Sequence, residues 1–379
     1  MKMVMVQSNL TLKGGAERVV LKIAQHYGAT VYTAEYDPAN TFPEFSDLDV
    51  SVISRGRLPR LIPYGRAAQG ISYGSAFYGF KVPGDYDVIN AHMAPSHWAR
   101  NRNERMVWYC HTPLREVYDM YKYRQSKREL YKRPLYAAGA AVVRTIDRRI
   151  TGEIELILAN SENTKSRISK YLGRGDAEVL NGGVDYKEYS NGGDGRYFLY
   201  PSRISPNKRQ EYAIKAFRIF QKRKKGNNYK LILAGPVSKD PFYKGYYDRI
   251  VRFASSAGNV KVIGAVDDAT LKGLYSRATA VLYPPIDEDY GLVPLEAMAS
   301  GKPVIAVNSG GPKETIADRS TGFLVGSEEE MAERMLAVAD SPSLSEDMGR
   351  AGVARIRKYY SWERFFRRFD RGLAKVRKM

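Results

Sequence analysis

Short apolar runs alternate with amphipathic segments along most of the chain. The first run, KMVMVQSNL (2–10), predicts a buried strand, followed by a glycine turn at 13–15 and a helix over 16–27. Further strands are expected at 29–32, 85–91, 106–110 and 154–159, with a helix over 161–171 capped by Ser161 or Asn163. Strands that alternate with helices favour a parallel sheet covered on both faces.

The alternation restarts after a turn-rich segment, NGGDG (191–195), which is the candidate linker. Beyond it, strands are predicted at 197–201, 230–234, 260–263, 280–283, 303–307 and 322–325, with helices over 209–221 and from 294. The predicted fold class is therefore α/β, with two Rossmann-like lobes over 1–190 and 196–355. Ligands are expected in a cleft between the carboxyl ends of their strands.

The last segment, SWERFFRRFDRGLAKVRKM (361–379), predicts a basic amphipathic helix with Trp362, Phe365, Phe366 and Phe369 near one face. Such a helix can lie on a membrane. A terminal helix of this kind more often packs on its own protein. We expect residues 356–379 to cross back to the N-terminal lobe.

The charge is strongly positive: 60 Lys and Arg against 41 Asp and Glu give a net +19. This surplus attracts phosphates of nucleotides, nucleic acids or anionic lipids, or serves solubility in general. No nucleic-acid-binding module is recognisable, so no nucleic-acid partner is expected. The single Cys110 excludes an intrachain disulfide, and no apolar run approaches the roughly 20 residues of a membrane span. We expect a cytoplasmic protein, soluble or peripheral on the membrane.

The segment DEDYGLVPLE (287–296) follows a predicted strand and leads into a helix. Gly291 permits a tight turn, and Pro294 suits the first helical position. The amides of Gly291, Leu292 and Val293 would then face an anion at the helix start.

Two carboxylates, Glu288 and Glu296, belong to the same segment. Beside a phosphate site they make sense if sugar hydroxyls are held there, because a carboxylate accepts hydroxyl hydrogen bonds well. Taken singly, Glu296 could only compensate the helix dipole, and Glu288 could be a solvated loop acid.

Other strand ends carry further candidates. Arg203 and Lys208 follow the strand YFLYP, where they could grip a diphosphate or be ordinary surface charges. Gly14 and Gly15 form a strand-to-helix turn that is not a GxGxxG fingerprint. His111 ends the strand MVWYC, a position that favours a functional role. His92 also follows a strand, and we expect it to line the cleft.

Together these motifs resemble the retaining glycosyltransferases of family 4, which have the two-lobed GT-B fold. Glu288 and Glu296 match their Glu-x7-Glu pair, and Arg203 and Lys208 match their Arg-x4-Lys pair. Gly14 and Gly15 match the glycine turn of their N-terminal lobe, and the segment 297–316 also looks similar. CHTPLR (110–115) and EDYG (288–291) are similar to a mannosyltransferase-like subgroup that builds cell-surface or lipid-linked glycans.

The resemblance implies a role for each matching residue. Glu296 would hold the ribose hydroxyls, Glu288 the hydroxyls of the donor sugar, Arg203 and Lys208 the diphosphate, and His111 the sugar near its reacting carbon. The implied catalytic residues are His111, Arg203, Lys208 and Glu288. The implied donor-binding residues are Gly14, Gly15, Arg203, Lys208, Gly235, Glu288, Tyr290, Gly291, Leu292, Val293 and Glu296.

The implied reaction is transfer of a hexose, mannose favoured, from a GDP- or UDP-sugar with retained anomeric configuration. No cofactor and no metal is expected, although Asp287-Glu288-Asp289 contains the Asp-x-Asp that other glycosyltransferases use for a divalent ion. The alternatives are a sugar-nucleotide-binding protein without catalysis, and transfer of glucose or N-acetylglucosamine from a UDP donor.

The acceptor is expected at the N-terminal lobe. Residues 55–81 and 115–149 mix basic with aromatic side chains, which suits a membrane interface with anionic headgroups. This predicts a peripheral enzyme that acts on a glycan, in particular a polyprenyl-linked one. The alternative is a set of solvated helix faces and core aromatics.

Overall fold

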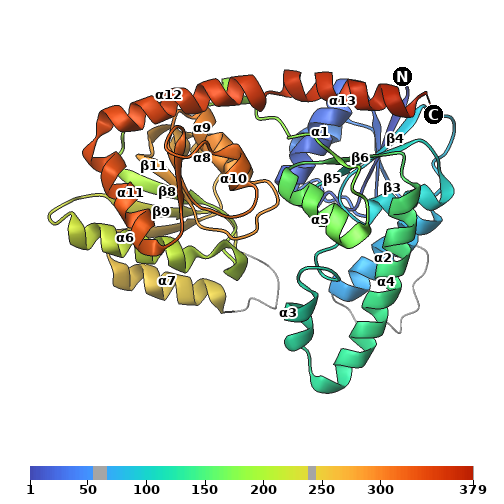
Figure 1. The fold of residues 1–379 in the computed structure, drawn as a ribbon, viewed down its shortest axis with the longest axis horizontal. Coiled ribbons are helices and arrows are strands. Elements are labelled where there is room, and N and C mark those ends of the chain that lie inside the picture. The colour runs from blue at the N-terminus through green and yellow to red at the C-terminus, as the bar shows by residue number, and fades with distance from the viewer. Residues whose placement is uncertain (54–65, 238–244, 379) are drawn as a thin grey trace. The chain divides into compact units, whose positions relative to one another are not determined.

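The computed structural model describes residues 1–53, 66–237 and 245–378, and its chain divides into two compact units (Figure 1). The first unit comprises Met1–Asn181 and Phe366–Met379, and the second comprises Gly182–Phe365. The contacts therefore divide the chain earlier than residue 190. The expected linker at 191–195 lies inside the second unit, where the buried Lys302 Nζ donates to Asn191 Oδ1 and to the Gly193 carbonyl, both at 2.7 Å.

The first unit is built on a seven-stranded parallel sheet of order β3-β2-β1-β4-β5-β6-β7. Its strands are β1 (Met3–Gln7), β2 (Thr30–Thr33), β3 (Val50–Val52), β4 (Val88–Ala91), β5 (Met106–Cys110), β6 (Leu156–Ala159) and β7 (Glu178–Val179). Its α-helices are α1 (Gly15–Tyr27), α2 (Arg66–Gly79), α3 (Tyr121–Ser126), α4 (Arg133–Glu153), α5 (Glu162–Leu172) and α13 (Trp362–Val376) from Phe366 onward. Short 3₁₀ helices are η1 (Pro43–Asp47), η2 (Ser96–Arg102) and η3 (Leu130–Lys132).

The second unit is built on a six-stranded parallel sheet of order β10-β9-β8-β11-β12-β13. Its strands are β8 (Tyr197–Pro201), β9 (Lys230–Ala234), β10 (Val260–Gly264), β11 (Ala280–Tyr283), β12 (Val304–Val307) and β13 (Gly322–Val325). Its helices are α6 (Gln210–Arg223), α7 (Tyr246–Ala257), α8 (Asp268–Arg277), α9 (Leu292–Ala299), α10 (Pro312–Thr315), α11 (Glu328–Asp340) and α12 (Pro342–Tyr359), with η4 (Tyr186–Glu188) and η5 (Pro206–Lys208). The predicted α/β class with two parallel sheets is confirmed.

The fully buried strands of both sheets coincide with the apolar runs that the sequence shows. The strands β1, β4, β5 and β11 are buried at every position, because helices cover a parallel sheet on both faces. Ser161 caps α5 as expected, since its side chain accepts a hydrogen bond of 2.9 Å from the Thr164 amide. The strand order changes direction between β1 and β4 and between β8 and β11, so the loops that follow these strands are the natural places for ligands.

The start of α9 differs from the expectation. Gly291 is the N-cap and the helix begins at Leu292, so Pro294 is the third helical residue and not the first. Its missing N–H still costs no hydrogen bond, because the first four amides of a helix have no partner within it. Glu296 is the fifth residue, beyond the first turn. Compensation of the helix dipole therefore explains it poorly, since that effect fades within one turn.

Several aromatic residues for which the sequence left a membrane surface open are buried. Tyr73 and Phe77 of α2 are buried in the core of the first unit, so this part of 55–81 follows the core alternative. Residues 54–65 lie outside the described residues. Phe365 and Phe369 of α13 are buried as well, which supports packing of the tail on its own protein. Among the described residues, no helix is long and apolar enough to cross a bilayer.

Candidate active site

The loops after the neighbouring strands β8 and β11 bring two predicted site residues together. Lys208 ends η5 and Glu288 follows β11, and they are far apart in the sequence. The Lys208 Nζ donates a hydrogen bond of 2.6 Å to Glu288 Oε2. The two side chains keep 20% and 25% of their surface exposed, so an entering ligand can reach both. This ion pair is the centre of the candidate site in the second unit.

Two buried tyrosines hold the residues of this pair by hydrogen bonds. Tyr200 of β8 donates a hydrogen bond to the Lys208 carbonyl, and the Tyr283 hydroxyl of β11 is hydrogen-bonded to Glu288. Burial, together with the nearby Glu288 carboxylate, raises the pKa of both phenols well above its usual value. Both hydroxyls therefore stay protonated and act as fixed donors. The carboxylate of Glu288 is thus held by one ammonium and one phenol group.

Glu296 is the second acid near Tyr283. Its Oε2 accepts a hydrogen bond of 2.7 Å from the hydroxyl of Tyr275, which is fully buried. Its negative charge also contributes to the raised pKa of Tyr283. The two predicted acids therefore face one common tyrosine, with Glu296 half-buried and positioned by a second phenol.

The turn between these acids needs glycine. Gly291 has φ of +83°, in the left-handed region, and a Cβ there would lie 3.4 Å from the Tyr283 ring. Leu292 and Val293 follow as the first helical residues. The side chain of Tyr290 turns into the core, where its hydroxyl donates 2.7 Å to the Gly182 carbonyl. A donor contact by Tyr290 would therefore come from its main chain.

Two glycines that the sequence did not identify as site residues support the same loop. The Gly311 amide donates 2.8 Å to the Glu288 carbonyl, and a Cβ at Gly311 would lie 2.4 Å from the Tyr290 carbonyl oxygen. Gly310, at φ of +62°, would place a Cβ 2.5 Å from the Glu288 carbonyl oxygen. The only signal in the sequence is the pair of glycines after the strand VIAV. Their role depends on β12 lying beside β11.

Arg203 and Gly235 occupy the ends of β8 and β9. Arg203 is exposed, and its loop is fixed because Gln210 Nε2 donates 2.9 Å to the Arg203 carbonyl and 2.9 Å to Ser202 Oγ. Gly235 has φ of +146°, and a Cβ there would lie 2.1 Å from the Ser202 carbonyl oxygen. The structure thus gives Gly235 a packing role beneath the Arg203 loop, whatever contact it makes to a donor.

In the first unit, His111 ends a chain of hydrogen bonds that begins at Asn90. Asn90 Nδ2 donates 3.0 Å to the Val107 carbonyl, which turns its Oδ1 toward His92. His92 Nε2 lies 2.8 Å from this oxygen, and His92 Nδ1 lies 3.1 Å from His111 Nε2. Since Oδ1 only accepts, the proton of a neutral His92 lies on Nε2. The Nδ1 of His92 is then an acceptor, so His111 carries its own proton on Nε2 and donates it to His92.

This arrangement determines the charge of the His111 ring and which of its nitrogens lacks a proton. Burial lowers the pKa of His111 to about 3 and that of His92 well below its usual value, so both rings are neutral at neutral pH. The Nδ1 of His111 is then an acceptor without a proton. His92 is fully buried, which corrects the expectation that it lines a cleft.

The glycine turn of the first unit has an unexpected neighbour. Gly14 is the N-cap of α1 and Gly15 its first residue, so the helix begins one residue earlier than the predicted 16–27. A Cβ at Gly14 would lie 2.4 Å from Oε2 of Glu17, whose side chain is buried in the first turn. A carboxylate at a helix start favours the helix but opposes a second anion at the same amides. A diphosphate contact by Gly14 and Gly15 therefore stays a prediction.

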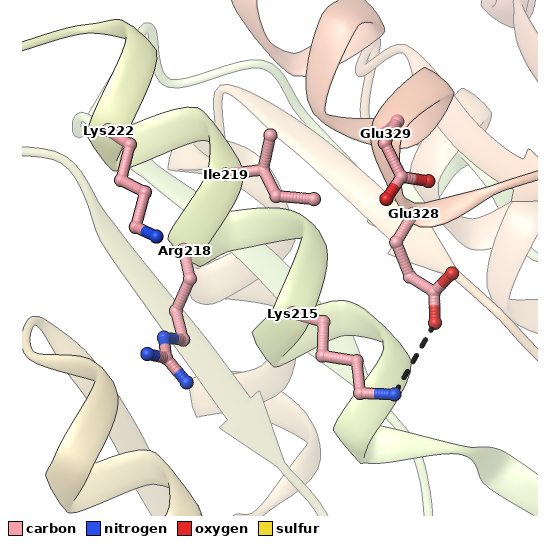
Figure 2. A pocket seen from close by; sticks show the side chains of 6 residues that line it. All are labelled: Lys215, Arg218, Ile219, Lys222, Glu328 and Glu329. Carbon is pink, nitrogen blue, oxygen red and sulfur yellow. Dashed lines mark ion pairs between the residues drawn. The ribbon is translucent and has the colours of Figure 1, made fainter.

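A separate pocket of about 300 Å³ lies along α6 and the start of α11. Figure 2 shows the side chains that line it: Lys215, Arg218, Ile219, Lys222, Glu328 and Glu329. Lys215 Nζ is 3.8 Å from Glu328 Oε1. None of the residues of the sequence motifs lines this pocket, which holds three basic and two acidic side chains. It therefore provides matched control positions for the site.

Comparison with known proteins agrees with this geometry. Residues 13–188 match the family model described as Glycosyltransferase Family 4, and residues 185–355 match the model described as Glycosyl transferases group 1. The alpha-1,3/1,6-mannosyltransferase ALG2 of Homo sapiens is 29% identical over 96% of this chain and 93% of its own. Sucrose-phosphate synthase from Thermosynechococcus elongatus has a TM-score of 0.77 at 18% identity over 99% of both chains. HepE from Anabaena, solved with UDP and glucose, has a TM-score of 0.76 at 18% identity over 99% of this chain and 100% of its own.

Proposed function

This chain belongs to the family 4 glycosyltransferases of GT-B fold, and from that premise we propose that it transfers mannose from GDP-mannose to a glycan with retention of the anomeric configuration. It is a hexosyltransferase that acts on a glycan acceptor. The Lys208–Glu288 pair, held by Tyr200 and Tyr283, is the observation that carries the proposal. The full-length similarity to mannosyltransferases supports mannose over other hexoses.

The Lys208–Glu288 pair explains how the diphosphate and the sugar of one donor could be recognised together. A diphosphate that enters beside Lys208 offers the ammonium a stronger anionic partner than one carboxylate. Glu288 then loses its cation and can accept hydrogen bonds from sugar hydroxyls. Binding of the sugar and binding of the diphosphate thus become coupled through the exchange of one ion pair, and Glu296 would take the ribose hydroxyls.

The same groups favour the transition state. As the bond between the anomeric carbon and the diphosphate oxygen breaks, the sugar becomes cationic and the leaving group gains negative charge. Lys208, Arg203 and the first amides of α9 stabilise that charge more than the ground state. The acceptor oxygen attacks from the face that the diphosphate leaves, and its proton passes to the departing phosphate. His111, with Nδ1 as acceptor, holds a hydroxyl of the donor sugar.

We also propose that the acceptor is polyprenyl-linked and that the enzyme works at the cytoplasmic face of a membrane. The support is the net charge of +19, together with basic and aromatic residues in 115–149. A UDP donor is the weaker candidate, since the HepE structures solved with UDP or UDP-glucose are 18–19% identical and show a likeness of fold alone.

The test is a nucleotide-release assay with GDP-mannose, UDP-glucose and UDP-N-acetylglucosamine, each with and without a polyprenyl diphosphate-linked glycan. We expect release from GDP-mannose that depends on the acceptor, and a product with an α-linked mannose by NMR. Binding of a donor without release, in the presence of the acceptor, would favour the sugar-nucleotide-binding protein without catalysis.

Chelation is expected to leave the activity unchanged. Lys208 and Arg203 supply the positive charge beside the diphosphate, and Glu288 is taken up by the hydroxyls of the donor sugar. The Asp287 carboxylate accepts a hydrogen bond of 3.2 Å from Ser309 Oγ. Initial rates with and without EDTA measure this. A loss of activity that magnesium or manganese restores would contradict the proposal.

Replacing His92 by phenylalanine is expected to lower kcat about tenfold and to change the donor KM by less than about twofold. The phenyl ring keeps the shape but cannot accept the proton of His111 Nε2, so the tautomer and orientation of His111 are no longer fixed. His92→Gln retains an accepting oxygen and should keep more activity. Equal kcat values for His92→Phe and the wild type would refute the positioning role.

A further inference from the structure

The three most exposed large hydrophobic side chains in the described parts of the chain lie together. Leu130, Tyr131 and Leu135 keep 74%, 75% and 78% of their surface exposed. They occupy η3 and the first turn of α4, at the tip of the hairpin that α3 and α4 form. In Figure 1 this hairpin extends away from the sheet of its own unit. Single exposed apolar residues are ordinary, but a contiguous group marks an interaction surface.

Aromatic contacts between α3 and α4 stabilise the tip. Tyr121 of α3 stacks on Tyr136 of α4 with ring centroids 5.4 Å apart. The Arg144 guanidinium covers the Tyr121 ring at 4.4 Å, and that of Arg128 covers the Tyr136 ring at 4.1 Å. Tyr136 is therefore used internally, while its neighbour Leu135 faces water. The exposed side chains are presented by an ordered element that has its own contacts.

The first turns of α4 bury no side chain completely, although Tyr136 packs against Tyr121. The buried residues of this helix are Ala140, Asp147, Ile150 and Thr151, which all lie in its last two thirds. The residues 133–139 include no buried side chain. Folding alone therefore does not account for the apolar residues at this end.

The charges around the tip select the kind of partner. Lys122, Lys127 and Lys132 are exposed on either side of the apolar residues. Glu129 is the one acid in the segment 120–136, and its Oε2 is paired with Lys132 Nζ at 2.6 Å. A second copy of the same tip would meet like charge. Leucine and tyrosine flanked by lysine fit the interface of a bilayer with anionic headgroups, where lysine reaches the phosphates while the apolar side chains enter the acyl region.

We propose that the tip of the α3–α4 hairpin, residues 122–135, docks this protein on an anionic lipid bilayer by inserting Leu130, Tyr131 and Leu135. The tail helix α13 is a poor competitor for this role, because Phe365, Phe369, Leu373 and Val376 are buried. The proposal rests on the membrane-bound acceptor of the proposed function for its purpose. Docking itself does not require that transfer take place.

Flotation of the full chain with vesicles tests it. Vesicles of phosphatidylcholine alone are compared with vesicles that also contain phosphatidylglycerol. We expect the wild type to float with the anionic vesicles at moderate salt. The triple variant Leu130→Ser, Tyr131→Ser, Leu135→Ser should lower the partition coefficient by roughly tenfold or more, since three apolar side chains no longer enter the bilayer.

Two further variants separate the contributions. Reversal of Lys122, Lys127 and Lys132 to glutamate should abolish binding to anionic vesicles. Val52→Ser with Ile71→Ser removes two apolar side chains of 56% and 48% exposure elsewhere in the first unit, and should bind like the wild type. Equal flotation of the wild type and the triple serine variant would overturn the proposal, as would a wild type that does not float.

Nucleotide release with a water-soluble glycan acceptor keeps this outcome apart from the proposed function. The triple serine variant should release GDP from GDP-mannose at the rate of the wild type, because the donor site is untouched. Vesicle binding without any release would refute the transferase activity and leave the docking surface standing. Nucleotide release by a wild type that does not bind vesicles would refute the docking surface and leave the transferase activity standing. Self-association of the wild type that the triple serine variant loses, without flotation, would identify the tip as a dimer contact and overturn the proposal.

Discussion

Replacing Lys208 by alanine is expected to lower kcat/KM for GDP-mannose by roughly a hundred- to a thousandfold. The variant loses the cation that would neutralise the leaving diphosphate. It also leaves Glu288 without its ammonium partner, so a carboxylate faces the incoming phosphates and repels them. Steady-state kinetics of nucleotide release measure the effect, and the loss should appear in kcat as well as in KM because the charge develops in the transition state.

A neighbouring lysine provides the control. Lys215 lies on α6 and reaches Glu328 at 3.8 Å in the pocket that carries no motif residue (Figure 2). Lys215→Ala should change kcat/KM by less than about twofold, because an exposed pair contributes little. Lys208→Arg keeps the charge and should recover part of the activity. If Lys208→Ala and Lys215→Ala gave the same kinetics, Lys208 would not act on the diphosphate.

The positions of the predicted site residues follow from the sequence because they depend on local rules. Apolar runs identify the strands, and a residue directly after a buried parallel strand must lie at the carboxyl edge of the sheet. Arg203, Glu288 and His111 were placed in this way. The contact between Lys208 and Glu288 was not derivable, since it requires β8 to lie beside β11, and strand order is a property of the whole sheet.

Other features depend on packing that no local pattern reveals. The strands β3 and β7 have three and two residues, too short for a periodic signal. The segment Asn191–Gly195 has the composition of a linker, but the buried Lys302 ties it to the second unit. Tyr290 is predicted as a donor contact from its place in the motif, and only the structure shows that its hydroxyl reaches the Gly182 carbonyl in the core, which leaves its main chain for such a contact. The sequence shows which residues a segment contains but not which way they face.

Replacing Gly311 by alanine is expected to lower kcat/KM roughly a hundredfold or more, although Gly311 touches no substrate in the proposed mechanism. The new Cβ would lie 2.4 Å from the Tyr290 carbonyl oxygen, and both are fixed parts of the backbone. Relief therefore requires the loop from Glu288 to Gly291 to shift. The hydrogen bond from the Gly311 amide to the Glu288 carbonyl, 2.8 Å, would then stretch. A shift of about 1 Å at a catalytic group is enough for a loss of this size.

The stability of the same variant shows whether the effect is local. Strain of this kind costs about 1–3 kcal/mol, so Tm should fall by only a few degrees while the circular dichroism spectrum stays native. Gly273→Ala is the matched control: it lies within α8, a Cβ there meets nothing within 4 Å, and alanine favours the helix by about 1 kcal/mol. Full activity in Gly311→Ala would show that the loop tolerates displacement. The geometry of Glu288 would then not limit catalysis, because Gly311 acts on the reaction only through that loop.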